Sequence, residues 1–304
     1  MLLSLALGAA LAAVVAMTGA AREADAAYPG TNGRIAFDSD RTTGAGVDNP
    51  TGDYEIFTVR KDGTGLRQLT NNTAADYSPS FSADGGTIAF TSARDGNSEV
   101  YVMSADGSSP FRVTTNTSHE YHPTISPDGT KIAYESDRTG NREIFVLGAG
   151  LETNVTNSAG FDGYPAFSPN GTRIAYESGR DGDSEIYSMS VDGTDVRNIT
   201  DNSVNDYAPD WSPGGKRIAF TSYQKSRHDV YVMNADGSGR KNLTADARAD
   251  FHPAWSPDGK RVAYSGASGT AYDVAAVNVR TEERAWLSPN PAYDTAPDWQ
   301  PLAS

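Results

Sequence analysis

The sequence repeats itself with a period of about 44 residues, and this repeat constrains the fold more than any other feature. A proline recurs at spacings of 44, 42, 44, 44 and 44 residues, at Pro79, Pro123, Pro165, Pro209, Pro253 and Pro297. An acidic residue stands three positions before each of them: Asp76, Glu120, Asp162, Asp206, Asp250 and Asp294. Six carboxylates in phase with six prolines are far beyond chance. The chain is therefore built from copies of one structural unit.

One copy, Tyr207–Asp250, predicts four short strands. They are Pro209–Trp211, Arg217–Thr221, Val230–Met233 and Asn242–Thr244. Proline and glycine follow the first strand and Asp236-Gly237 follows the third, which are residues that tight turns require. The third strand is apolar without alternation, which predicts burial on both faces. Such a small sheet cannot be stable alone and must stack between similar sheets.

A repeat of this length with four strands predicts an all-β fold, a six-bladed β-propeller of four-stranded antiparallel blades. The first copy begins at Gly33-Arg34-Ile35 and lacks a first strand, whereas the C-terminal Thr295–Trp299 is a first strand alone. We expect this C-terminal strand to complete the N-terminal blade. That pairing closes the ring and removes the open sheet edges that favour aggregation.

Two segments carry a resemblance to a known family. Residues 126–146, SPDGTKIAYESDRTGNREIFV, and residues 256–265, SPDGKRVAYS, resemble the WD-repeat-like blade of TolB-like six-bladed propellers. The resemblance covers roughly residues 33–301. We therefore expect neither the α/β domain that precedes the propeller in TolB nor the hydrolase domain of prolyl-oligopeptidase-like enzymes. The resemblance implies a partner in the cell envelope, since TolB docks a peptidoglycan-associated lipoprotein.

The first 27 residues differ from the repeats, so we divide the chain into a signal peptide (1–27) and a propeller (28–304). Leu2–Met17 is almost entirely Leu, Ala and Val, and small residues that suit cleavage follow it. No Lys or Arg precedes the run, so the alternative is an uncleaved anchor, although the run is short for a span of about 20 residues. We expect export to the periplasm or outside the cell. The chain has no cysteine, so disulfides and cysteine lipidation play no part.

The composition excludes some partners and reactions. The net charge is −14, from 39 acidic and 25 basic residues, and such a surface repels nucleic acid and anionic membranes. The sequence contains no phosphate-binding loop and no Gly-x-Ser-x-Gly nucleophile elbow. We therefore predict no enzymatic activity.

Two of the four histidines occupy equivalent places in the repeat. His122 and His252 precede the repeat proline directly, and Tyr164 has the same position in another copy. Because the first strand of a blade lies nearest the axis, we expect these three side chains near the channel mouth. A metal site would require a third ligand in a short-range motif, which neither histidine has. Polar side chains beside a water-filled channel are the simpler interpretation.

The six repeated acids allow two interpretations. Each could cap a turn, accepting backbone N–H groups where the fourth strand of one blade crosses to the next. Together they could instead form a ring that binds a basic peptide or, weakly, a cation such as calcium, which prefers several oxygen ligands. The recurring arginines Arg94, Arg138 and Arg180 are expected to pair with a carboxylate of their own blade, such as Glu99, Glu143 or Glu185.

These features support two functions of different classes. The first is an exported, monomeric binding module without catalysis, whose channel face takes a protein or peptide. The alternative is a calcium-dependent enzyme, lactonase-like or lyase-like, with its site at the central channel. The candidate site residues are the same in both: Asp76, Glu120, Asp162, Asp206, Asp250, Asp294, His122, Tyr164 and His252.

Overall fold

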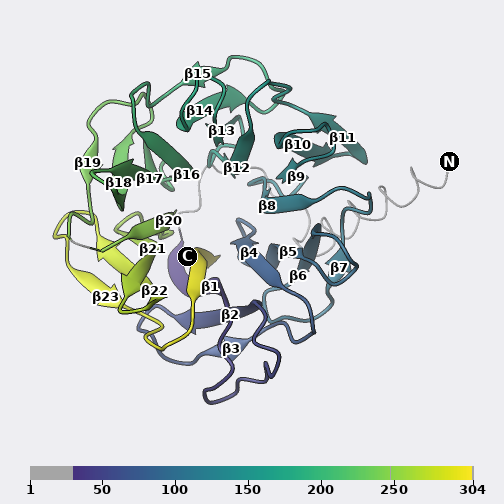
Figure 1. Cartoon of the computed structure of the whole chain (residues 1–304), viewed down its shortest axis with the longest axis vertical. Helices are drawn as coiled ribbons and strands as arrows, with labels where there is room; N and C mark the ends of the chain where they lie inside the picture. The colour runs from purple at the N-terminus through teal and green to yellow at the C-terminus, as the bar shows by residue number, and fades with distance from the viewer. Residues whose placement is uncertain (1–29, 247, 303–304) are drawn as a thin grey trace.

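The computed structural model describes residues 30–246 and 248–302, so the predicted signal peptide over residues 1–27 lies outside the described residues. Strands are the only regular structure in these ranges, and they form six four-stranded sheets. The sheets are the blades of a ring around a central axis (Figure 1). The prediction of a six-bladed all-β propeller is confirmed.

Each blade runs outward from an inner strand that lines the axis. The inner strands of blades 2 to 6 and of blade 1, in that order, are β4 (Asp76–Phe81), β8 (Glu120–Ile125), β12 (Asp162–Phe167), β16 (Asn205–Trp211), β20 (Asp250–Trp255) and β24 (Asp294–Leu302). The second strands of blades 1 to 6 are β1 (Thr31–Ser39), β5 (Thr87–Ser92), β9 (Lys131–Ser136), β13 (Arg173–Ser178), β17 (Arg217–Gln224) and β21 (Arg261–Ser268).

The outer half of each blade contains a full-length third strand and a short edge strand. The third strands are β2 (Glu55–Arg60), β6 (Glu99–Ser104), β10 (Glu143–Gly148), β14 (Glu185–Ser190), β18 (Arg227–Asn234) and β22 (Ala271–Asn278). The edge strands are β3 (Arg67–Gln68), β7 (Phe111–Arg112), β11 (Leu151–Asn154), β15 (Arg197–Asn198), β19 (Lys241–Asn242) and β23 (Arg284–Trp286). Short edges limit pairing with other molecules.

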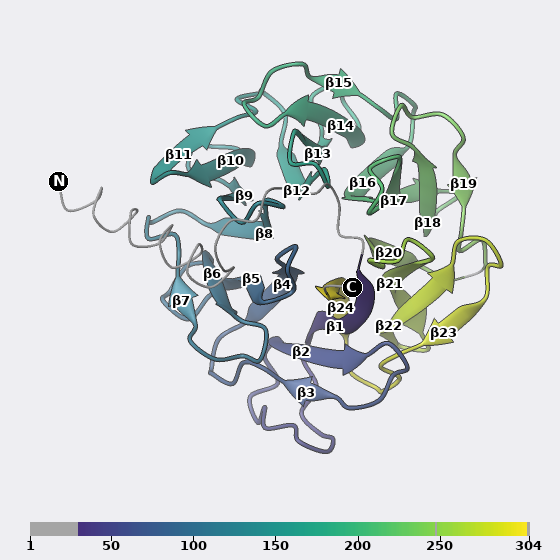
Figure 2. The same cartoon turned by 180° about the vertical axis from the view of Figure 1, so that it is seen from behind.

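The ring closes through the two ends of the chain, as the sequence predicts. The C-terminal strand β24 pairs antiparallel with β1, with Ile35 opposite Trp299 and Ser39 opposite Asp294. Figure 2 shows the two strands side by side in blade 1, next to the C-terminus. Blade 1 is thus assembled from residues more than 250 positions apart, and the inner edge of β1 is paired.

The hydrophobic cores lie between neighbouring blades rather than inside one sheet. Six clusters of buried side chains each combine residues of two adjacent blades. One of them joins Ile35, Phe37 and Trp299 of blade 1 to Val274 of blade 6. Strand β5 is buried at all six positions because both of its faces are covered. This stacking explains why the second and third strands are apolar without alternation.

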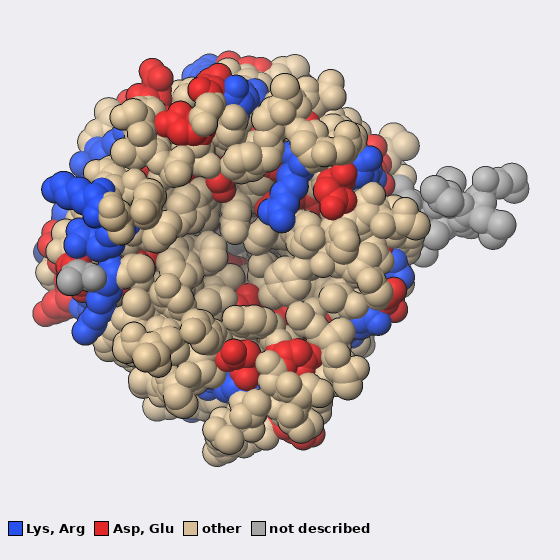
Figure 3. Space-filling view, in the orientation of Figure 1, with Lys and Arg blue, Asp and Glu red and all other residues tan. Residues whose placement is uncertain are grey.

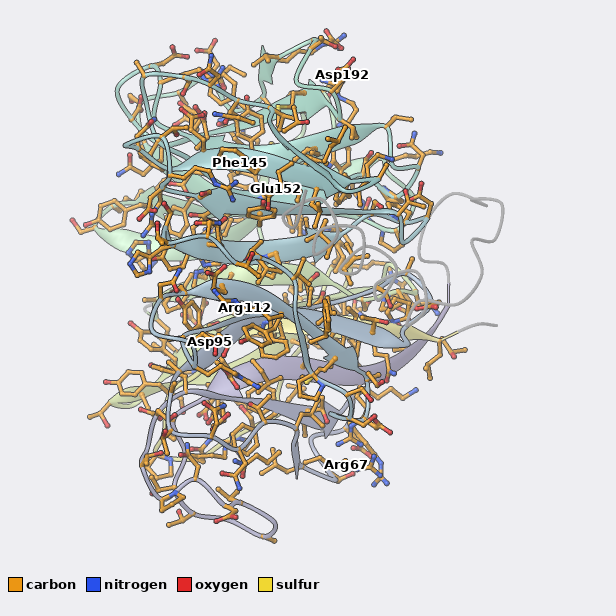
Figure 4. The ribbon with its side chains drawn as sticks, turned by 90° about the vertical axis from the view of Figure 1, so that its right-hand side faces the viewer. Arg67, Asp95, Arg112, Phe145, Glu152 and Asp192 are labelled. Carbon is orange, nitrogen blue, oxygen red and sulfur yellow. The ribbon has the colours of Figure 1, made fainter. Side chains whose placement is uncertain are left out.

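The two faces of the ring differ in the turns that they carry. Figure 4 shows the ring from its edge, with Asp95 of the β5–β6 turn on one side and Arg67 and Asp192 on the other. We call the face with Asp95 the mouth face; it turns toward the viewer in Figure 1 and contains the first residues of the inner strands. The long loop between β1 and β2 projects from the lower edge of the ring (Figure 1).

The β17–β18 hairpin of blade 5 is longer than the repeat pattern indicates. Strands β17 and β18 extend to Gln224 and Arg227, beyond the predicted strand ends at Thr221 and Val230. The two turn residues, Lys225 and Ser226, have φ angles of 52° and 61°. Two left-handed residues in succession are typical of the tight turn whose twist matches paired strands. In the described ranges no helix is long and apolar enough to cross a membrane.

Candidate functional site

A bulge in every inner strand shapes the channel. The residue before each repeat proline adopts a left-handed conformation, with φ between 47° and 53°, at Ser78, His122, Tyr164, Ala208, His252 and Ala296. Five inner strands shift register at this place against the second strand of their blade, and β24 also shifts beside its own bulge residue. Proline suits such a bulge because it has no N–H to donate to the sheet. Each bulge turns one side chain toward the axis.

The bulge residues line a cavity on the axis, which we call the axial cavity. Its volume is about 140 Å³, and the six repeat prolines form part of its wall. A second cavity of about 60 Å³ continues from it toward the opposite face, and Asp210 and Asp298 line both. Figure 3 shows the hollow at the centre of the mouth face, with acidic side chains visible inside it.

Three aromatic rings are stacked across the axial cavity. The ring centroids of His122 and Tyr164 are 4.0 Å apart, and those of Tyr164 and His252 are 5.6 Å apart. Burial, together with repulsion from His122 and His228, lowers the pKa of His252 to about 3, so this imidazole is neutral at pH 7. The structure therefore brings together the three candidates His122, Tyr164 and His252. Their role in binding stays a prediction.

Three acids of the second strands surround this stack, and the sequence analysis did not single them out. Asp38 and Glu135 accept backbone N–H groups of the bulge residues Ser78 and Tyr164, at 2.8 and 3.1 Å, so each links two blades. Burial raises the pKa of Asp38 to about 6 and that of Glu177 to about 7. Burial acts in the same direction on Glu135, but His122, the backbone N–H of Tyr164 and Arg142 together outweigh it and lower the pKa.

Two further acids lie deeper in the channel. Asp210 accepts the backbone N–H of Trp255 at 2.6 Å, and Asp298 accepts that of Phe81 at 2.6 Å, so both also link adjacent blades. Burial raises the pKa of Asp298 to about 7. Burial, followed by repulsion from Asp298, raises the pKa of Asp210 to about 8. Both directly follow a repeat proline, but four other blades carry Ser80, Thr124, Ala166 and Ala254 at this position, so no periodic signal identifies them.

Aromatic rings surround the cavity on the mouth face. Neighbouring rings lie 4.0 to 6.5 Å apart between centroids, which is the range of favourable aromatic contacts. We call this set the aromatic collar: Tyr77, His119, Tyr121, His122, Tyr164, Tyr207, Tyr223, His228, Phe251, His252, Tyr272 and Tyr293. Arg142 lies over the Tyr121 ring at 4.8 Å and is half exposed.

The six repeated acids lie apart from the axial cavity, whose lining comes from other residues. Asp76, Glu120, Asp162, Asp206, Asp250 and Asp294 are all buried at the mouth-side start of the inner strands. Their main partners are side chains rather than the backbone N–H groups expected of turn caps. Asn72, for example, donates to Asp76 at 2.7 Å, and Asn202 donates to Asp206 at 2.6 Å.

Four of the six acids form ion pairs with the recurring arginines. Arg41, Arg94, Arg138 and Arg180 pair with Asp294, Asp76, Glu120 and Asp162, respectively. The last three arginines therefore pair with a carboxylate of their own blade, as predicted, but this is the inner-strand acid and not the suggested Glu99, Glu143 or Glu185. The guanidinium of Arg138 lies 4.2 Å from the centre of the Phe145 ring and also forms an ion pair with Glu152. Figure 4 shows Phe145 and Glu152 beside each other.

The acids of the third strands cap the turns between blades, a role that was expected of the acids of the inner strands. The carboxylates of Glu55, Glu143 and Glu185 accept the backbone N–H groups of Asn72, Ser158 and Asn202, at 2.6 to 3.0 Å. These acceptors lie where the chain leaves an edge strand for the next blade. Glu99 differs, since it pairs with Arg112 at 2.5 Å, near Asp95 (Figure 4). The two sets of acids therefore have exchanged the roles that the repeat pattern suggested.

No three His, Asp or Glu side chains in residues 30–246 and 248–302 are grouped to hold a metal ion. The channel carboxylates Asp210 and Asp298 are each engaged by a backbone N–H. The metal-site interpretation of the six repeated acids stays a prediction.

Comparison with known structures places the fold beside TolB. TolB from Acinetobacter baumannii superposes with a TM-score of 0.78 at 21% identity, covering 88% of this chain and 67% of that one. Putative TolB from Agrobacterium tumefaciens gives a TM-score of 0.66 at 21% identity over 89% and 99% of the two chains. An oligogalacturonate lyase in complex with manganese is more distant, at a TM-score of 0.55 and 17% identity over 86% and 75%.

The sequence comparisons agree with the structural ones. A TolB homolog from Chlorobium luteolum is 54% identical over 43 residues, which are 14% of this chain and only 10% of that relative. The family model of the TolB beta propeller domain matches residues 4–148 and 122–304, and so covers most of the chain. The chain belongs to the TolB beta propeller domain family.

Proposed function

We propose that this propeller is an exported, non-catalytic module that binds a protein or peptide at its mouth face. The observation that carries the proposal is the aromatic collar around an open cavity. Tyrosine is enriched among the residues that dominate binding energy at protein interfaces, because it combines a large apolar area with a polar tip. Tyr223 and Tyr293 of the collar are both 39% exposed.

The charges around the collar favour a partner with basic residues. The chain has a net charge of −14, and Asp38, Glu135 and Glu177 lie next to the cavity. Electrostatic complementarity steers such a partner to the mouth and fixes its orientation. The TolB relatives suggest an envelope protein as partner, and the module is expected to act as a monomer.

Site-specific photo-crosslinking tests the location of the binding face. A crosslinking amino acid at Tyr121 or Tyr207 should capture a discrete partner from the native envelope fraction. The same amino acid at Asp192, which is exposed on the opposite face, serves as the matched control. The purified partner should then bind the wild type saturably, and Tyr121→Ala with Tyr207→Ala should weaken that binding at least tenfold. Crosslinks from Asp192 alone would refute the proposal.

Export is the second part of the proposal and rests on the apolar segment Leu2–Met17. A secreted form should begin between Ala20 and Tyr28, because the small residues in this interval suit cleavage. Mass spectrometry of the protein purified from the periplasm or medium measures this directly. Retention of Met1 on a membrane-associated form would show an anchor instead.

A calcium-dependent enzyme is the second candidate, favoured by the carboxylates of Asp210 and Asp298 in the channel. A ligand that binds only the folded state raises its stability by mass action, by about 2.7 kcal/mol at 100 times the dissociation constant. Melting with and without calcium, in the wild type and in Asp298→Asn, tests for a channel cation. Turnover of a substrate would still be required to establish an enzyme.

A further inference from the structure

Comparison of the six blades with one another identifies a site that blade 5 leaves incomplete. In blades 1 to 4, an arginine directly after the second strand closes the mouth-side end of the blade. Its Nε donates to the serine that ends this strand, at 2.7 to 2.9 Å, and one Nη pairs with the repeated acid of the inner strand. The four arginines are Arg41, Arg94, Arg138 and Arg180.

Each of these guanidinium groups also lies on two aromatic rings. One ring comes from the second strand and one from the third, and the distances from Cζ to the ring centroids are 4.2 to 5.8 Å. The arginine therefore has cation–π contacts, an ion pair and a neutral hydrogen bond at once. The same three kinds of contact in four blades define what this position recognises, which is a guanidinium group.

Blade 5 has the recognition elements without the arginine. Asp206 is the inner-strand acid, Ser222 is the serine opposite it on the second strand, and the rings of Phe220 and Tyr231 lie 5.7 Å apart at 32°. The equivalent rings of blade 2, Phe90 and Tyr101, lie 5.7 Å apart at 37°. We call Asp206, Ser222, Phe220 and Tyr231 the blade-5 slot.

Gln224 takes the sequence position of the arginine and fills only part of its place. Its Nε2 donates to Ser222 Oγ at 3.1 Å, as the arginine Nε does elsewhere. A glutamine ends at this nitrogen, so the planar carbon and the two terminal nitrogens of a guanidinium are missing. Among the described residues no Lys or Arg lies within 4.0 Å of the Asp206 carboxylate, and Asp206 Oδ1 has no hydrogen-bond partner.

The slot is open to solvent on the mouth face. Tyr231 is partly exposed, whereas the equivalent rings Tyr101, Phe145 and Tyr187 are buried under their arginines. The side chains of Arg94, Arg138 and Arg180 are themselves 20 to 23% exposed, so the position that they occupy is reached from outside. Tyr223 and His228 of the aromatic collar are neighbours of this slot on β17 and β18. A partner on the collar can therefore reach it.

Nearby groups do not already satisfy the slot. Arg227 lies opposite Gln224 in the hairpin, but it pairs with Asp229 and not with Asp206. Arg240 acts on Asp206 only from a distance, since its guanidinium donates to the carbonyl oxygen of Thr200. In blade 6 a glycine, Gly266, replaces the serine, and Arg284 lies 3.8 Å from the repeated acid Asp250. Blade 5 is thus the one blade among the described residues that keeps the acid, the serine and both rings and lacks the cation.

We propose that the blade-5 slot binds the guanidinium group of an arginine side chain presented by the partner, with Gln224 turning aside to admit it. This inference rests on the proposed function for the identity of the bound molecule, but the slot itself can be tested without any partner. Gln224 is held by a single side-chain hydrogen bond at the end of a hairpin, so its displacement breaks only that contact.

The test uses N-acetyl-argininamide as the probe, with N-acetyl-lysinamide as the control of equal charge. Titration followed by NMR should show saturable binding of the arginine probe to the wild type, at least tenfold tighter than the lysine probe. Gln224→Arg should fill the slot from within and abolish binding, without loss of folding. Asp206→Asn should weaken binding at least tenfold, whereas Asp192→Asn on the opposite face should leave it unchanged.

A gain-of-site variant completes the design. Arg94→Gln gives blade 2 the arrangement of blade 5, so the number of bound arginine probes should rise from one to two. No saturable binding to the wild type, equal affinity for both probes, or unchanged binding to Gln224→Arg would each overturn the proposal. If the partner still binds the collar in these cases, only the slot is wrong; if the probe binds and no partner does, only the proposed function is wrong.

Discussion

Ser39 and Asp294 lie 255 positions apart in the chain and face each other across the sheet that closes the ring, with the serine hydroxyl donating to the carboxylate at 2.5 Å. Arg41 pairs with the same carboxylate at 2.5 Å. The same hydrogen bond between serine and acid occurs within a continuous blade, where the Ser136 hydroxyl donates to Glu120 at 3.0 Å. The C-terminal strand is therefore as much a part of blade 1 as the other inner strands are of theirs.

The closure predicts that Trp299 contributes as much stability as its counterpart in a continuous blade. Trp299 and Trp255 are both buried between blades. Trp299→Ala and Trp255→Ala should each lower the free energy of unfolding by about 3–5 kcal/mol, the usual cost of emptying a tryptophan site. Chemical denaturation of the two variants measures this. A loss near zero for Trp299→Ala alone would mean that the ring closes without its last strand.

Arginine and glutamine at the equivalent positions of blades 2 and 5 predict opposite changes in stability when each is replaced by the other. Arg94→Gln should cost about 1–3 kcal/mol, because it removes a charged hydrogen bond and the contacts with two rings. Gln224→Arg should add up to about 1 kcal/mol, less than the reverse change costs, since the neighbours of Gln224 have adapted to it. Thermal and denaturant unfolding of both variants test this. A destabilised Gln224→Arg would show that the blade-5 slot does not accept a guanidinium.

The channel acids predict a falling stability at high pH. Burial raises the pKa of Asp210 from 3.8 to about 8 and that of Asp298 from 3.8 to about 7. A carboxyl whose pKa is higher in the folded state binds its proton more tightly there, so its contribution is complete below about pH 4 and is lost as the pH rises through 7 to 8. The wild type should therefore be less stable at pH 8.5 than at pH 6.

Asp210→Asn isolates this effect, since an amide keeps an oxygen for the Trp255 N–H and never ionises. The variant should have a higher melting temperature than the wild type at pH 8.5 and the same melting temperature at pH 4. Melting curves between pH 4 and 9 give the comparison. An equal shift of the variant at all pH values would assign the effect to packing rather than to ionisation.

The left-handed bulges predict an unusual response to glycine. Ala208 has a φ of 50°, a conformation that costs an ordinary residue about 1–2 kcal/mol and glycine almost nothing. Ala208→Gly should therefore be neutral or stabilise by up to about 1 kcal/mol, after the entropy of the unfolded chain is included. Ala89 lies within strand β5, and Ala89→Gly should cost about 1 kcal/mol. A similar loss of stability from both substitutions would show that the backbone at Ala208 is not strained.

The sequence predicts the fold well because the repeat is a property of the cores. Ile35, Phe37 and their counterparts are buried in every blade, so they recur in phase and identify the strands. The channel is a different matter. Asp210 and Asp298 share their position with Ser80, Thr124 and Ala166, and a place occupied by unlike residues produces no periodic signal. The sequence pattern also could not assign the roles of the acids. Asp76 and Glu99 both lie beside Ser92 in the sheet, and only the path of the side chain decides that Arg94 meets Asp76.

The bulge residues have a consequence for how this surface can change over evolutionary time. Each of the six lines the channel and is followed by a proline. In four of them, Ser78, Tyr164, His252 and Ala296, the backbone N–H also donates to a side chain of a neighbouring blade. Exchange of Ser78, His122, Tyr164, Ala208, His252 or Ala296 therefore alters what the mouth presents while the scaffold is left intact. Six independently replaceable positions around one axis let a single architecture acquire new partners by one substitution at a time.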